Sequence, residues 1–323
     1  MMPAGARPIR SLAAALVAGL GACATASDVD ARKARPPPKS RPMPQEPTLC
    51  RLEKWADRAT AVRLSALLVE QFIASFERAP EELVLDFDAT DNPLHGQQEQ
   101  RFFHGYYDCY CYLPLYVFCG QQLLCAYLRP SRNDGAQHSA AILKLLVRRL
   151  RQVWPAVRII LRRDSGFCRQ RIINWCERSQ VHYIVGLARN PKLEAMVEYA
   201  QLALHEQYQR TGVKQRLVGE FGYAAQSWPR ERRVITRLEW GEQGHNPRFV
   251  VTNLAGDPDA LYDEVYCQRG EAENRIKEAQ LDLFGTQISD EGLKHLRGQP
   301  LLVLTDQHAT GCSSANRRHH LAD

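Results

Sequence analysis

The sequence predicts an α/β fold in which a mixed sheet is flanked by helices and carries a β-rich insertion. Three observations predict this class. A buried apolar strand at 83–88 ends in carboxylates, helices alternate with strands between about 142 and 187, and the segment 213–254 has the pattern of successive strands. Such an order is typical of a domain built from a sheet covered by helices.

Length and composition indicate a globular chain. The sequence has 323 residues, of which 45% are hydrophobic and 24% are charged, with a net charge of +6. These values exclude a fibrous or wholly disordered chain. No apolar run of about 18 residues occurs, so we expect no transmembrane helix and no membrane partner. The ten cysteines form no CxxC pair, which favours reduced core thiols over a zinc site.

The N-terminal part differs from the rest of the sequence. In the first 46 residues, two arginines precede an apolar run that contains the box LGAC at 20–23, a pattern typical of a secretory signal of the lipoprotein type. The Lys/Arg/Pro-rich stretch 31–47 that follows is predicted to be disordered. From 48 to 78, apolar residues recur at helical spacing and predict a helix.

The strand at 83–88 is expected to place two carboxylates on one face. In a strand, Asp86 and Asp88 point to the same side, and the apolar residues between them point to the other. The segment 101–119 is rich in aromatic and β-branched residues, and 122–128 continues as a strand. Together, these three segments predict a three-stranded antiparallel meander.

The next elements alternate between helix and strand. Apolar residues on one face predict a helix that Pro155 ends. The predicted elements in chain order are a helix at 142–153, a strand at 157–161, a helix at 169–179, a strand at 181–187, the β-rich insertion and a helix at 259–281. This order suggests an RNase H-like α/β domain with an inserted β-rich subdomain.

Acidic residues lie at two predicted strand ends. Asp86 and Asp88 end the first strand, Asp91 lies just beyond it, and Asp164 follows the strand at 157–161. Strand ends are where α/β folds place catalytic groups. The segment 140–178 holds ten basic residues and two acids. Carboxylates beside a basic surface suit metal-dependent chemistry on phosphodiesters; turn capping and two oppositely charged solvated faces are the alternatives.

A stripe of polar residues runs along the last predicted helix. Its members step by three or four positions, which places them on one helix face: Tyr266, Arg269, Glu273, Lys277 and Gln280. A solvated helix with ion pairs such as Glu273–Lys277 also fits this spacing. The stripe nevertheless resembles the Tyr-Arg-Glu signature of one branch of the DDE-type transposases of bacterial insertion sequences. The blocks 85–96, 163–168 and 266–284 resemble that family in order, within a similarity that covers roughly 47–285.

The resemblance implies three catalytic, metal-binding carboxylates. Asp88 matches the first because Ala89 and Thr90 follow it, although Asp86 is a close competitor. Asp164 matches the second carboxylate and Glu273 the third. The family has a Lys seven residues after the Glu, where this chain has Gln280, and Lys277 lies one turn nearer and could serve instead.

The same resemblance implies the cofactor and the partners. Two Mg²⁺ ions are expected, and Mn²⁺ could substitute for them. Asp88 is expected to bridge both ions, while Asp164 binds one and Glu273 binds the other. Such a pair activates the attacking oxygen and stabilises the leaving oxygen. The expected DNA contacts are Tyr266, Arg269, Lys277, Arg162 and Arg163. The partners are double-stranded DNA, as terminal inverted repeats and target, and a second copy in an active homodimer.

The chain ends depart from the family pattern and suggest a copy truncated or frame-shifted at both ends. We expect a disordered or signal-like segment at 1–46, a remnant of a helical region at 47–80, the catalytic domain at 81–285 with its insertion at about 205–255, and an unrelated tail at 286–323. The signal-like start would then be accidental and the protein cytoplasmic, at the nucleoid. The alternatives are an inactive remnant that at most binds DNA, a structure-specific nuclease and an exported lipoprotein.

Overall fold

The computed structural model describes residues 58–94 and 101–281. All described residues belong to one compact unit of the chain. The predictions for 1–46 and 286–323 therefore lie outside the described residues. Within the described ranges, no helix is both long and apolar enough to cross a bilayer.

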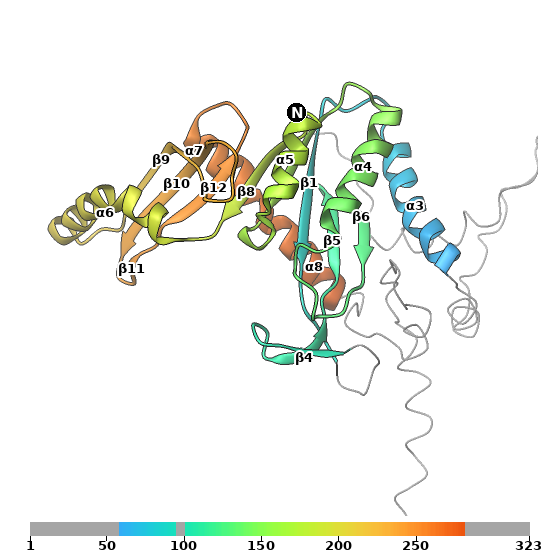
Figure 1. The fold of residues 1–323 in the computed structure, drawn as a ribbon, viewed down its shortest axis with the longest axis horizontal. Coiled ribbons are helices and arrows are strands. Elements are labelled where there is room, and N and C mark those ends of the chain that lie inside the picture. The colour runs from blue at the N-terminus through green and yellow to red at the C-terminus, as the bar shows by residue number, and fades with distance from the viewer. Residues whose placement is uncertain (1–57, 95–100, 282–323) are drawn as a thin grey trace, which may run out of the picture. The chain divides into compact units, whose positions relative to one another are not determined.

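One large mixed sheet forms the centre of the fold (Figure 1). It has nine strands in the order β11-β10-β12-β8-β7-β1-β5-β6, and β9 also pairs with β10. The strands are β1 (Glu82–Ala89), β5 (Leu115–Cys119), β6 (Gln122–Tyr127), β7 (Arg158–Arg163), β8 (His182–Leu187), β9 (Gln215–Tyr223), β10 (Arg232–Gly241), β11 (Gly244–His245) and β12 (Arg248–Thr252). The predicted mixed sheet is confirmed, and the order β6-β5-β1-β7-β8 is that of an RNase H-like core.

The central strand β1 shows the predicted alternation. It runs antiparallel to β5 and parallel to β7, with Asp86 opposite Phe118 on one side and Arg162 on the other. Leu85 and Phe87 are buried in the main core. Because side chains alternate along a strand, Asp86 and Asp88 point to the other face of the sheet.

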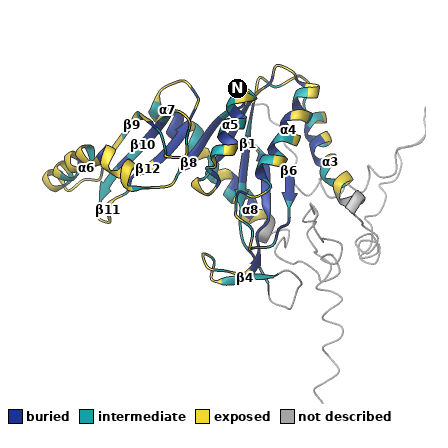
Figure 2. Cartoon of the chain, viewed as in Figure 1, coloured by how far each residue is buried: buried dark blue, intermediate teal, exposed yellow. Residues whose placement is uncertain are grey.

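Helices cover both faces of this sheet (Figure 1). The helices α4 (Ser139–Val153) and α5 (Gln170–Arg178) bury apolar residues such as Leu143 and Ile172 in the core beneath Leu85. The helix α8 (Gly270–Leu281) packs Ala272 and Ile276 against Tyr116 and Phe118, which belong to the opposite face. The helix α3 (Arg58–Ala74) packs on β6. Figure 2 shows the sheet strands largely buried and the outer helix faces exposed.

The segment 101–119 does not form one strand. It divides into β3 (Phe102–His104), β4 (Cys109–Tyr112) and β5, and the first two join β2 (Asn92–Pro93) in a separate three-stranded sheet. Two local features break it: a turn with Asp108 at a φ of 53°, and Pro114, which has no N–H to donate to a ladder. The meander of β1, β5 and β6 is nevertheless formed.

The strands of the predicted insertion continue the main sheet. β12 pairs antiparallel with β8 over Phe249–Leu187 to Thr252–Ile184, and β10 then pairs with β12 and β9. A helix that the sequence analysis missed, α6 (Pro191–Thr211), precedes them. The Asn190 side chain accepts a hydrogen bond from the Leu193 N–H at its start, and Gly212 ends it at a φ of 65°.

Candidate active site

Three carboxylates from three elements lie near one another. Asp88 is the penultimate residue of β1, Asp164 directly follows β7, and Glu273 lies in the first turn of α8. Because β1 and β7 are parallel neighbours, their carboxyl ends meet at one edge of the sheet. The negative charges of Asp164 and Glu273 both act on the Asp88 carboxyl.

The environment of Asp88 disfavours its charged form. Burial, reinforced by the charge of Asp164, raises the pKa of Asp88 to about 7. A hydrogen bond of 2.8 Å from the Ala89 N–H to Oδ1 and the positive charge of Arg269 oppose this rise. A carboxyl group with a pKa this far above its ordinary value marks a place where negative charge accumulates out of water.

Asp164 carries an oxygen without a partner. Its Oδ1 atom is buried and accepts no hydrogen bond from the described residues. Burial raises the pKa of Asp164, while Arg269 and the N–H groups of Gly166 and Phe167 oppose the rise. A buried acceptor of this kind is costly unless something else binds it.

The segment 258–281, whose sequence resembles the Tyr-Arg-Glu signature (the signature segment), is helical but changes its winding. A short helix α7 (Pro258–Ala260) is followed by one π-helical stretch, η2 (Leu261–Tyr266), one 3₁₀ turn, η3 (Cys267–Arg269), and then α8. The expected uniform stripe is therefore interrupted at both Tyr266 and Arg269. Insertions of π-helix occur often at functional sites.

Arg269 is the cation of the site. It forms an ion pair with Glu273, and its guanidinium carbon lies 6.0 Å from the centroid of the Tyr266 ring. Burial alone would lower the pKa of Arg269, but the neighbouring groups, which include Asp88 and Asp164, outweigh it and raise the pKa. Cys267, between Tyr266 and Arg269, is exposed.

Gly186 makes room for Tyr266 beside Asp164. A Cβ atom at Gly186 would lie 2.6 Å from the Tyr266 hydroxyl oxygen and 2.7 Å from the backbone nitrogen of Ser165. Only a glycine allows the β8 strand to approach both groups this closely. The sequence analysis missed this residue; the available signal was a glycine inside the predicted strand 181–187.

Asp86, the competitor of Asp88, is fully engaged inside the protein. It is 3% exposed, and Arg162 donates to its Oδ1 from Nε at 2.5 Å and to its Oδ2 from Nη2 at 2.7 Å. The third nitrogen of the guanidinium, Nη1, donates to the Val265 carbonyl at 2.6 Å. Arg162 thus joins β1, β7 and the residue before Tyr266.

The other predicted DNA-binding residues have different surroundings. Arg163 is 0% exposed, with its guanidinium carbon 4.0 Å from the Phe87 ring centroid and Nη1 donating to the Ser139 hydroxyl at 3.2 Å. Lys277 is exposed on α8, whereas the side chain of Gln280 lies outside the described residues. Arg162 and Arg163 are buried and stabilise the strands under the site, so they are not part of the proposed DNA surface.

The oxygen chemistry of the site suits a hard divalent cation. Mg²⁺ binds carboxylate oxygens and keeps several waters, and the unpartnered Oδ1 of Asp164 and the raised pKa of Asp88 are what such an ion would relieve. In the ranges 58–94 and 101–281, however, no three His, Cys, Asp or Glu residues are grouped closely enough to hold a metal ion. Glu273 is instead paired with Arg269.

Comparison with known proteins gave a solved structure and a family that match this chain. A structure of the piggyBac transposase synaptic complex with hairpin DNA matches with a TM-score of 0.36 and 13% identity, covering 74% of this chain and 46% of that one, so this chain spans less than half the length of that protein. None of the curated proteins compared matches the sequence. The profile of the family described as transposase DDE domain group 1 matches residues 27–297, beyond the 47–285 resemblance at both ends. Since that match covers most of the sequence, the chain belongs to the transposase DDE domain group 1 family.

Proposed function

We propose that this chain is a DNA transposase that hydrolyses and transfers phosphodiester bonds at insertion-sequence ends. The observation that carries the proposal is the approach of three carboxylates from β1, β7 and α8: the charges of Asp164 and Glu273 act on Asp88, and the charge of Glu273 acts on Asp164. Asp88 takes the role of the first carboxylate, because Arg162 occupies both oxygens of Asp86.

Asp88, Asp164 and Glu273 would hold two Mg²⁺ ions, or Mn²⁺ in their place. When bound, such ions supply positive charge to the attacking and leaving oxygens of the phosphodiester. The protein contributes the buried setting of Asp88 and the unpartnered Oδ1 of Asp164. Glu273 becomes available as a ligand when Arg269 leaves it for another anion.

That other anion is a DNA phosphate. Arg269 is partly buried next to all three carboxylates, and Tyr266 lies against it. An arginine in this place would bind a phosphate oxygen beside the scissile bond and orient the strand. Lys277, exposed one turn after Glu273, would contact the same DNA farther out.

The proposed partners follow from this chemistry. The substrates are the terminal inverted repeats and a target duplex, and two copies of the chain would pair the two ends of the element in a homodimer. Such substrates would place the protein in the cytoplasm, at the nucleoid.

Matched substitutions of two glutamates test the proposal. Glu273→Gln should abolish Mg²⁺- or Mn²⁺-dependent cleavage of duplex DNA, and Asp164→Asn should do the same, while both variants keep their DNA affinity. Glu242→Gln, at an exposed position of the turn between β10 and β11, is the control and should cleave like the parent. Cleavage and joining are followed on labelled duplexes in gels.

The outcomes separate the alternatives. Joining of the cut ends by the parent, lost in both site variants, supports the transposase. Cutting of branched DNA without joining would indicate a structure-specific nuclease. DNA binding without any cutting would indicate an inactive remnant, and equal cleavage by Asp164→Asn would overturn the site.

A further inference from the structure

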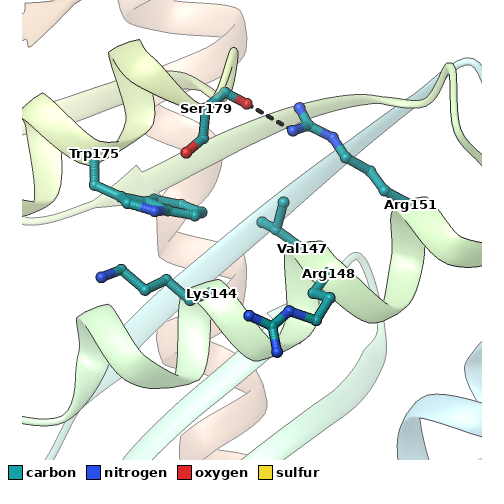
Figure 3. A pocket seen from close by; sticks show the side chains of 6 residues that line it. All are labelled: Lys144, Val147, Arg148, Arg151, Trp175 and Ser179. Carbon is teal, nitrogen blue, oxygen red and sulfur yellow. Dashed lines mark hydrogen bonds between the residues drawn. The ribbon is translucent and has the colours of Figure 1, made fainter.

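A groove runs between α4 and α5, on the face of the sheet opposite α8 (Figure 3). Its volume is about 220 Å³. Six residues line it: Lys144, Val147, Arg148, Arg151, Trp175 and Ser179. The groove therefore combines three cations with an apolar and aromatic wall, and no carboxylate is among its lining residues.

The cationic charge of this face is not balanced by its own helices. The helix α4 contains four basic residues and no acid, and α5 contains two basic residues and one acid, Glu177. Glu177 already pairs with Arg230 and Arg232. Arg149 points away to pair with Glu70. The groove side of the two helices is thus left with a surplus of positive charge.

One of the three groove cations has a structural task. Arg151 donates to the carbonyl groups of Ser179 at 2.6 Å and Gln180 at 2.8 Å, where α5 ends (Figure 3). These bonds fix the spacing of α4 and α5 and so form one wall of the groove. Lys144 and Arg148 make no ion pair with any carboxylate that the structure describes, so their charges are available to a ligand.

The aromatic residue lies beside these two cations. The Lys144 ammonium is 5.8 Å from the centroid of the half-buried Trp175 ring (Figure 3). A cationic groove that follows the backbone, with an aromatic side chain beside it, is common in proteins that bind nucleic acids. A duplex carries one negative charge about every 1.7 Å along its axis, about twice the density of an extended acidic protein segment, whose residues lie about 3.3 Å apart.

We propose that the α4–α5 groove binds the sugar–phosphate backbone of a stretch of DNA other than the one at the carboxylates. Lys144 and Arg148 contact phosphates, and Trp175 packs against the sugars. Cations that contact phosphates position a duplex without reading its sequence, so this surface should accept any DNA. The inference rests on the proposed function only in taking DNA as the polyanion that the protein meets.

The salt dependence of DNA binding tests this inference. Affinity of the full chain for a labelled duplex of arbitrary sequence is measured by fluorescence anisotropy over a NaCl series, in an Asp164→Asn background that prevents cutting. Lys144→Gln/Arg148→Gln should lower the slope of log affinity against log salt by about 1.8, because each lost phosphate contact removes about 0.9. The matched control Arg78→Gln/Arg210→Gln removes the same charge from exposed positions elsewhere and should keep the parental slope.

Several results would overturn the proposal that the groove binds DNA. Equal slopes for the groove variant and the parent would show that Lys144 and Arg148 contact no phosphate. Equal losses in the groove and control variants would show that only net charge matters. A polyglutamate peptide that binds the parent as tightly as DNA, and loses affinity with the groove variant, would assign the groove to an acidic protein instead. Cleavage is assayed separately with Asp164 intact, so a lowered slope without any cleavage by the parent overturns the transposase proposal alone.

Discussion

Asp88 is the residue on which the charges of the site meet. Its side chain is half-buried, and the charges of two other carboxylates and one guanidinium act on it. Without a bound cation, protonation of Asp88 reduces the repulsion between the carboxylates. The pKa of Asp88 is therefore raised to about 7. The proposed metal ions would take the place of this proton.

The pH dependence of stability should report this proton. The pKa of Asp88 is raised from 3.8 to about 7 in the folded protein, so the folded chain binds more protons than the unfolded chain between these values. The free energy of unfolding contributed by Asp88 is then present at acidic pH and falls as the pH rises toward 7. The loss is a few kcal/mol at most, since one pKa unit corresponds to about 1.4 kcal/mol.

Urea unfolding in EDTA at about pH 5 and about pH 8 measures the effect. The parent should lose more stability across this range than Asp88→Asn, which cannot titrate there. Added Mn²⁺ should stabilise the parent at the higher pH and leave the variant nearly unchanged. Parallel pH profiles for the two proteins would contradict the assignment of the raised pKa to Asp88.

At the scale of elements, two contacts dock the signature segment on the sheet. Arg162 donates to the Val265 carbonyl, and one residue later Tyr266 fits against Gly186 of β8. Both contacts lie just before the first turn of α8, so they set where Arg269 and Glu273 stand relative to Asp164.

A methyl group at Gly186 should disturb this docking. Gly186→Ala would place Cβ 2.6 Å from the Tyr266 hydroxyl and 2.7 Å from the backbone of Ser165, which forces at least one element to move. We expect a loss of about 1–3 kcal/mol of stability together with weaker cleavage. Gly219→Ala, in β9, has no atom within 4 Å of the new Cβ and serves as the control. Similar melting temperatures and cleavage rates for the two variants would show that this close approach is unimportant.

The elements also show how far the sequence could be interpreted. The alternation of β1 could be predicted because apolar and acidic residues alternate from 85 to 88. The prediction of a single strand at 101–119 is wrong. It is based on the aromatic and β-branched composition of the segment and does not take account of the turn at Asp108 and the proline at 114. The helix α6 was missed although its cap residue Asn190 and its end at Gly212 are typical signals.

For the site, spacing and resemblance lead to the proposal of three carboxylates, but they do not predict that Arg162 and Arg163 are buried. Arg162 and Arg163 follow each other in a basic stretch, and such a stretch is typical of a solvated surface. Their side chains are instead buried on opposite faces of β7, one on Asp86 and one on Phe87. Asp86, the partner of Arg162, lies 76 positions away in the chain, so the sequence around Arg162 does not indicate this ion pair.

At the scale of the whole described chain, one sheet joins the carboxylate site to the β9–β12 strands. Besides the β12–β8 ladder, a buried polar cluster crosses this junction. Arg232 of β10 donates to Glu177 of α5 at 2.8 Å and to Asn174 at 2.6 Å. Burial raises the pKa of Glu177, but hydrogen bonds from Arg232, Tyr183 and Arg230 outweigh burial and lower it. The two parts should therefore unfold together.

Calorimetry of two arginine variants tests this coupling. Arg232→Met removes a buried partner of Glu177 and should lower the stability by about 2–4 kcal/mol, shifting a single transition as a whole. Arg230→Met removes a partner of the same carboxylate whose side chain is 61% exposed, and should cost less than about 1 kcal/mol. Two separate transitions, only one of which moves in Arg232→Met, would show that the β9–β12 strands unfold on their own.

The exposed thiol of Cys267 makes the signature segment accessible to a dye. Among the cysteines that the structure describes, this is the only exposed one. With Cys23, Cys50 and Cys312 replaced by serine, a maleimide fluorophore would attach to Cys267. Labelling would be faster under mildly alkaline conditions, because partial burial raises the pKa of this thiol. The dye would sit one residue after Tyr266 and two before Arg269. Its fluorescence intensity would then report binding of a cation or a DNA strand to the segment in real time, without any bond being cut.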